Sequence, residues 1–237
     1  MSEQQAATAP KVKKSVALSG TAAGNTAICT VGRTGNALHY RGYDILEFAD
    51  DAEFEEIAYL LIHGILPNQG QLAEYKRHLQ SQRDLPAALK TVLEQLPASA
   101  HPMDVLRTGA SVLGTLEPEK EAQPVAAARG IGDRLIACFG SMLLYWYHFS
   151  HHGRRIDEET DDASIAAHFL HLLHGRRPSD LHVRAMHTSL NLYAEHEFNA
   201  STFTARVIAG TGSDIYSCVS GAIGALRGPK HGGANEV

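Results

Sequence analysis

A histidine lies in a turn-forming run near the end of the sequence, Gly228-Pro229-Lys230-His231-Gly232-Gly233. Proline and glycine favour a turn here. Ala234-Asn235-Glu236 is predicted to begin a helix, because glutamate is favourable near a helix N-terminus. The positive end of a helix disfavours an imidazolium, so a neutral histidine at this point could donate a hydrogen bond to an oxyanion as it forms. His231 is therefore a candidate catalytic residue.

Three further polar side chains, Tyr193, His196 and Asn199, recur at every third position. Near the end of a predicted helix, this spacing would align them on one stripe beside Leu192 and Phe198. Tyrosine, histidine and asparagine on a buried helix face need hydrogen-bond partners, and a bound ligand could supply them. A polar cluster satisfied within the protein, at a junction between helices, is the alternative that the spacing leaves open.

The sequence contains 14 histidines, and most of them need no chemical role. Those at 148, 151 and 152 fall at the end of a predicted helix, where histidine is favourable. His168, His171 and His174 follow one another at intervals of three and could ligate zinc, but no HExxH motif, acidic ligand or cysteine pair accompanies them. We expect core or interface histidines here and no metal site, and we keep a zinc protein as an alternative.

Composition and charge exclude several classes of protein. The 237 residues carry a formal net charge of -5, and their 21 lysines and arginines are scattered, so no nucleic-acid-binding surface is indicated. The most apolar segment, 136–149, is too short and too polar for a membrane span and is predicted to be a buried helix. Cys29, Cys138 and Cys218 are widely spaced, which indicates reduced thiols and a cytoplasmic location.

The residue pattern predicts a mainly α protein with a small N-terminal β element. Residues 1–14 are expected to form a flexible leader without a secretory signal, and 15–45 a β-hairpin region in which Gly35-Asn36 fits a tight turn. A large helical domain follows over 46–228, and 229–237 would start the helix of His231. Helices are predicted at about 51–63, 69–82, 86–95, 102–115, 121–149, 161–174, 179–195, 200–210 and 214–226.

Single residues refine these helix predictions. Asp51 is a candidate N-cap of the first helix, and Gly64 a candidate terminator. Gly221, Gly224 and Gly228, in or after the last helix, would permit a neighbouring helix to approach closely.

Several of these segments together are similar to one enzyme family. They are His39-Tyr40-Arg41-Gly42-Tyr43-Asp44-Ile45, residues 101–108, residues 144–148, residues 194–203 and residues 227–236. From about residue 14 to 237 the chain resembles the citrate synthase family. The resemblance implies a homodimeric, mostly helical enzyme with a large and a small domain. Such an enzyme condenses an acyl-CoA with oxaloacetate, hydrolyses the thioester and needs no metal or redox cofactor.

The same resemblance implies roles for the candidate residues. His231 would hydrogen-bond the thioester carbonyl and stabilise its enol. His196 would contact oxaloacetate, with Asn199 beside it, and Tyr193 could touch the acyl pocket. Within the family the chain resembles the branch that uses propionyl-CoA and yields 2-methylcitrate in propionate catabolism, with a preference for acetyl-CoA as the runner-up.

Family members continue well beyond the motif at His231. The resemblance implies that a second catalytic histidine, a catalytic aspartate and the arginines for oxaloacetate lie in that further part. We therefore expect this sequence to be an N-terminal portion that is inactive by itself. A non-catalytic helical scaffold or dimerisation module is the alternative of another class.

Overall fold

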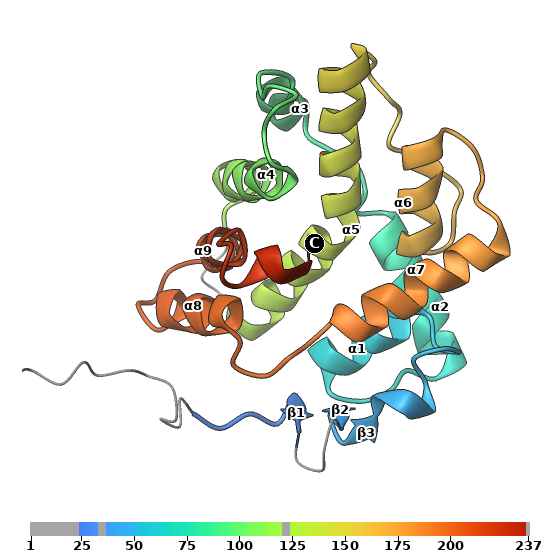
Figure 1. Ribbon diagram of the computed structural model, residues 1–237, viewed down its shortest axis with the longest axis vertical. Helices are drawn as coiled ribbons and strands as arrows, with labels where there is room; N and C mark the ends of the chain where they lie inside the picture. The colour runs from blue at the N-terminus through green and yellow to red at the C-terminus, as the bar shows by residue number, and fades with distance from the viewer. Residues whose placement is uncertain (1–23, 33–36, 120–123, 236–237) are drawn as a thin grey trace, which may run out of the picture.

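The computed structural model describes residues 24–32, 37–119 and 124–235, and this part is mainly helical (Figure 1). A small sheet of β1 (Cys29–Val31), β2 (Leu38–Tyr40) and β3 (Tyr43–Asp44) precedes the helices. These are α1 (Phe54–His63), α2 (Gln69–Gln80), α3 (Ala87–Glu94), α4 (Pro102–Leu116), α5 (Pro124–His152), α6 (Ile165–His174), α7 (Asp180–Tyr193), α8 (Ala200–Ala209) and α9 (Ile215–Leu226). The predicted fold class and the order of the helices are confirmed.

The sheet is a meander of two antiparallel pairs. Cys29 pairs with Tyr40 between β1 and β2, and Tyr40 pairs with Tyr43 between β2 and β3. The second hairpin turns on Arg41 (φ 52°) and Gly42 (φ 95°), both in the left-handed region that a tight two-residue turn requires. β3 was not predicted, because Arg41 gives no turn signal. Gly35-Asn36, the whole predicted leader 1–14 and the first part of the predicted β-hairpin region lie outside the described residues.

Helix ends account for most differences from the predicted boundaries. The prediction of Asp51 as the cap of α1 was wrong, because Glu53 is the N-cap and its N–H donates to Glu56 Oε2 at 2.8 Å. Gly64 ends α1 in the left-handed conformation (φ 88°), as predicted. α6 begins later than predicted, because Ser164 Oγ accepts from the Ala167 N–H and caps it.

The main core forms around α5, the longest described helix. Figure 1 shows α5 in the middle, with α3 and α4 on one side and α6 on the other. Met142 is fully buried on α5, as predicted for the apolar segment 136–149, and it packs with Val105 and Leu113 of α4. Burying such side chains contributes about 1.5–3 kcal/mol each. Among the described helices, none is both long enough and apolar enough to cross a membrane.

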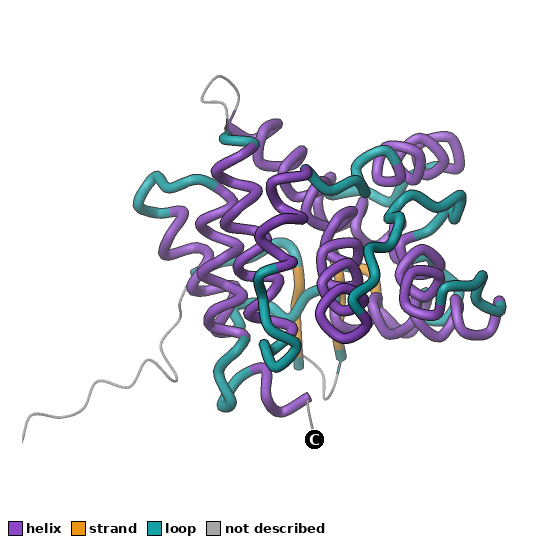
Figure 2. The backbone as a smooth tube through the Cα atoms, turned by 90° about the horizontal axis from the view of Figure 1, so that it is seen from above, coloured by secondary structure: helices purple, strands orange, loops and turns teal. Residues whose placement is uncertain are grey.

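Close packing of α8 against α9 fixes the geometry at the end of the described chain. A Cβ on Gly221 of α9 would lie 2.2 Å from Ile208 Cδ1 of α8, so the end of the Ile208 side chain would have to move to admit one. The predicted close approach is thus confirmed for Gly221. In the view of Figure 2 a short 3-10 helix, η2 (Gly232–Asn235), follows α9 and ends near the C-terminus. The turn that carries His231 therefore lies where α9 leads into η2.

A buried histidine on α6 is held by two hydroxyl groups. His168 Nε2 lies 3.2 Å from Ser141 Oγ, and its Nδ1 lies 3.0 Å from Thr160 Oγ1. Only 1% of the residue is exposed. Burial, with a smaller contribution from the Arg83 charge, lowers the pKa of His168 to about 3.

Stability is expected to depend on pH through His168. The unfolded chain binds a proton at this histidine near its ordinary pKa of about 6.5, while the folded protein does not, so stability falls as the pH drops below that value. His168→Gln can keep hydroxyl contacts without a titrating group. Urea unfolding at pH 7, 6 and 5 should give the wild type a steeper loss, by at most about 1.4 kcal/mol per pH unit. Parallel pH profiles for the two proteins would contradict this expectation.

Candidate functional site

The ring of His231 reaches the first turn of α8. Its Nε2 lies 3.3 Å from the backbone nitrogen of Ser201 and 3.1 Å from Ser201 Oγ. A backbone N–H can only donate, so Nε2 is the acceptor, and a neutral ring then carries its proton on Nδ1. The ring satisfies one of the amides that a helix start leaves without an intrahelical partner. His231 is thereby oriented with Nδ1–H as the group that could donate to a substrate oxygen.

The helix start beside His231 is not the one predicted. We expected an α-helix to begin at Ala234, but Gly232–Asn235 form a 3-10 helix. Two consecutive glycines disfavour a regular α-helix at this point, and Glu236 lies outside the described residues. The helix N-terminus that meets His231 belongs instead to α8, which is 30 residues away in the sequence.

Asn199 is the N-cap of α8. Its Oδ1 accepts from the Thr202 N–H at 2.9 Å and from Ser201 Oγ at 2.7 Å. Because the single Ser201 hydroxyl proton goes to Asn199, it is the Ser201 backbone N–H that donates to His231 and links the cap of α8 to that ring. The side-chain oxygen Oδ1 of Asn199 is thus used in capping α8. The N–H groups of the same side-chain amide can donate in another direction.

The structure separates the three residues that were predicted to share a helical stripe. α7 ends at Tyr193, which is 69% exposed, and His196 lies exposed in the connector 194–199. Glu197 takes a left-handed backbone conformation (φ 54°), which is incompatible with a continuing helix. The prediction of one stripe was therefore wrong. His196 and Asn199 still lie three residues apart, now on a single connector that leads into α8.

Charges around the connector are partly buried. Burial raises the pKa of the Glu195 carboxyl above its ordinary range, while N–H groups of Glu197 and His196 oppose the shift. The Arg206 guanidinium lies 4.5 Å from the centre of the Phe198 ring, which fixes this ring beside α8. The connector is therefore held by polar and aromatic contacts on both sides of His196.

The histidines of α6 do not form a common metal site. Both ring nitrogens of His168 face hydroxyl groups, and His171 Nδ1 lies 2.6 Å from Asp162 Oδ2. In the described ranges the ligand atoms close enough to share a metal ion are those of Asp161, Asp162 and His171. Asp161 is already paired with Arg177, and Asp162 with His171.

Comparison with known proteins identifies the family. Residues 17–237 match the model described as citrate synthase, C-terminal domain. The chain belongs to the citrate synthase family. It is 61% identical to a 2-methylcitrate synthase of Shewanella oneidensis over 93% of this chain and 58% of that protein. It is 43% identical to 2-methylcitrate synthase 2 of Corynebacterium glutamicum over 97% of this chain and 61% of that protein.

A solved citrate synthase of Thermoplasma acidophilum has the same fold. Its ternary complex with carboxymethyl coenzyme A and oxaloacetate matches with a TM-score of 0.82 and 28% identity, covering 92% of this chain and 57% of that one. This chain of the citrate synthase family thus spans a little under two thirds of the length of these relatives.

Ser201 is the site residue that sequence reasoning missed. It was part of the segment that resembled the citrate synthase family, but it received no role. Its position two residues after the N-cap is the signal that could have found it, because the second helical N–H points out of the helix start. The partner of that N–H could not be predicted, since α9 brings His231 to it from far along the sequence.

The turn of His231 is expected to tolerate alanine at one glycine and not at its neighbour. A Cβ on Gly232 would lie 2.0 Å from the Leu226 carbonyl oxygen, whereas a Cβ on Gly233 has Pro229 Cβ as its nearest atom, at 3.6 Å. Gly232→Ala should therefore cost about 1–3 kcal/mol of stability and move His231 from Ser201. Thermal unfolding and the ring 15N shifts of His231 would measure both effects. Gly233→Ala is the matched control, and equal effects from both variants would contradict this account.

Proposed function

We propose that this chain supplies the thioester-polarising and oxaloacetate-binding part of an acyltransferase of the citrate synthase family. The reaction condenses propionyl-CoA with oxaloacetate and water to give 2-methylcitrate and CoA, in propionate catabolism. The observation that carries the proposal is the hydrogen bond from the Ser201 N–H to His231 Nε2, which leaves Nδ1–H as a donor. The 61% identity to a 2-methylcitrate synthase supports the choice of product.

His231 is proposed to stabilise the enolate of the acyl-CoA. The α-carbon of a thioester is a weak acid, so a donor must face the carbonyl oxygen as negative charge develops on it. The Nδ1–H of His231 is such a donor, and the rigid start of α8 fixes the ring before substrate arrives. A carboxylate must remove the α-proton in the same step, and the resemblance implies that it lies beyond residue 237.

His196 and the side-chain amide of Asn199 are proposed to bind oxaloacetate. Both stand on the connector into α8, and His196 is exposed. A hydrogen bond to the carbonyl oxygen of oxaloacetate makes the carbonyl carbon more electrophilic, so that the enolate can attack it. Tyr193, exposed at the end of α7, is proposed to contact the acyl group.

Further parts of the proposal concern assembly and cofactors. We propose a homodimer, supported by apolar side chains that remain exposed on α4 and α8, Leu116 at 42% and Val207 at 56%. The three cysteines are free thiols, which supports a cytoplasmic location. No metal or redox cofactor is needed for this chemistry, because hydrogen bonds stabilise the enolate.

Removing the His231 ring is expected to reduce turnover. We would join this chain to the remaining length of the Shewanella oneidensis relative and follow CoA release from propionyl-CoA and oxaloacetate. His231→Ala should lower kcat by about 100- to 1000-fold, as for loss of one oxyanion donor. His182→Ala, at an exposed histidine near the start of α7, is the control. An unchanged rate for His231→Ala would contradict the role of His231.

Substrate preference is tested with the same joined protein. One methylene changes pocket discrimination by only about 1–3 kcal/mol, so acetyl-CoA should also react, with a lower kcat/KM than propionyl-CoA. A strong preference for acetyl-CoA would replace the 2-methylcitrate product with citrate and leave the role of His231 intact.

A further inference from the structure

The connector that carries His196 is anchored to the N-terminal sheet by a buried tyrosine. Tyr40 of β2 has no exposed surface. Its hydroxyl donates to the Asn191 carbonyl oxygen at 2.9 Å and accepts from the Glu195 N–H at 3.3 Å. One phenol therefore holds both the last turn of α7 and the residue directly before His196.

A second anchor lies on the other side of His196. Glu197 Oε1 accepts from the Val31 N–H of β1 at 2.9 Å, across 166 residues of sequence. β1 is an edge strand, so the Val31 N–H has no partner strand on that side. The Glu197 carboxylate accepts a hydrogen bond from this N–H, which would otherwise be left to water. Glu197 keeps its left-handed backbone (φ 54°), which a residue other than glycine adopts only where its surroundings hold it.

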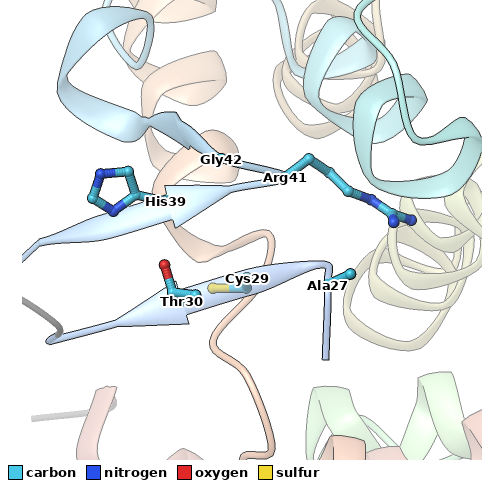
Figure 3. Close-up of a pocket in the computed structure, with 6 residues that line it drawn as sticks. All are labelled: Ala27, Cys29, Thr30, His39, Arg41 and Gly42. Atoms are coloured by element: carbon cyan, nitrogen blue, oxygen red, sulfur yellow. The ribbon is translucent and has the colours of Figure 1, made fainter. Parts of the chain in front are cut away.

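The two anchors bracket His196 in both sequence and space. Figure 3 shows β1 and β2 side by side, with the pale orange chain of the α7–α8 connector passing behind them. Ala194 of this connector packs on the cluster of Cys29 and Tyr40. His196 itself remains exposed, so its place depends on the backbone at Glu195 and Glu197.

We propose that Tyr40 and Glu197 are positioning residues that hold His196 in the geometry for oxaloacetate. A site held on a rigid sheet keeps its donor in place before the ligand binds, which lowers the ordering cost of binding. The inference rests on the proposed role of His196. It gives the small sheet, which lies far from His231 in sequence, a part in substrate affinity.

Two variants and two matched controls test this inference. Tyr40→Phe removes only the buried hydroxyl, and Glu197→Ala removes the acceptor for Val31. Tyr75→Phe is the control for loss of a buried hydroxyl elsewhere, since Tyr75 of α2 donates to Asp133 of α5 at 2.7 Å. Glu197→Gln keeps a side-chain oxygen acceptor. In the joined protein described above, we would measure for the wild type and each variant the hydrogen exchange of amides 194–199, oxaloacetate affinity by calorimetry, and thermal stability.

Faster exchange over 194–199 and about 3- to 10-fold weaker oxaloacetate binding are expected for Tyr40→Phe and Glu197→Ala. Glu197→Gln should behave like the wild type. Tyr75→Phe should lose stability without either effect. Connector exchange in Tyr40→Phe and Glu197→Ala no faster than in Tyr75→Phe would overturn the inference, as would faster exchange with unchanged affinity.

His196→Ala separates this inference from the proposed function. If the wild type binds no oxaloacetate, or if His196→Ala binds it equally well, the proposed role of His196 is wrong. In that case the exchange data still test the inference: slow connector exchange in Tyr40→Phe and Glu197→Ala would show that Tyr40 and Glu197 do not hold His196 in place. If His196→Ala loses binding and the two anchor variants retain it, the positioning inference alone fails.

Discussion

The contact between α8 and α9 is the constraint on which the candidate site depends. Gly221 lets α9 lie so close to α8 that an added Cβ would come within 2.2 Å of the end of the Ile208 side chain. Since α9 leads directly into the turn of His231, its distance from α8 decides whether the imidazole reaches the Ser201 N–H. Gly232 then lets the turn fold back onto the last turn of α9, beside the Leu226 carbonyl. Packing at small residues thus sets the geometry of a polar contact some ten residues away.

The groups that stabilise the start of α8 are the same groups that orient the site. Asn199 caps the helix, Ser201 bonds to the cap, and His231 accepts from an amide that the helix leaves unused. Helix starts need such partners in any protein, so these contacts contribute to folding whether or not a substrate is bound. A donor fixed in this way needs no rearrangement when charge develops on a carbonyl oxygen, which is where electrostatic stabilisation is most effective.

Periodicity predicted the helices well because most of them bury a regular apolar face. The segment 136–149 is an example, since its apolar run became the buried centre of α5. Local polar residues were less predictable. A spacing of three suggested a helical stripe for His196 and Asn199, whereas α7 ends at Tyr193 and a left-handed Glu197 lies between the two residues. Motif resemblance found His231, but its partner Ser201 depends on how the successive helices α8 and α9 pack, which no local pattern encodes.

Three separate stretches of sequence are linked through the α7–α8 connector and the start of α8. The sheet supplies Tyr40 and Val31, the connector supplies His196 and Asn199, and α9 delivers His231. Each of these hydrogen bonds joins a polar side chain to a main-chain group, so it depends on backbone position more than on the identity of neighbouring apolar side chains. The core around α5 can therefore vary in composition while the site keeps its shape, provided that the helices keep their spacing. The residues least free to vary are those where backbones meet, such as Gly232 beside the Leu226 carbonyl, and those whose polar atoms bridge separate elements.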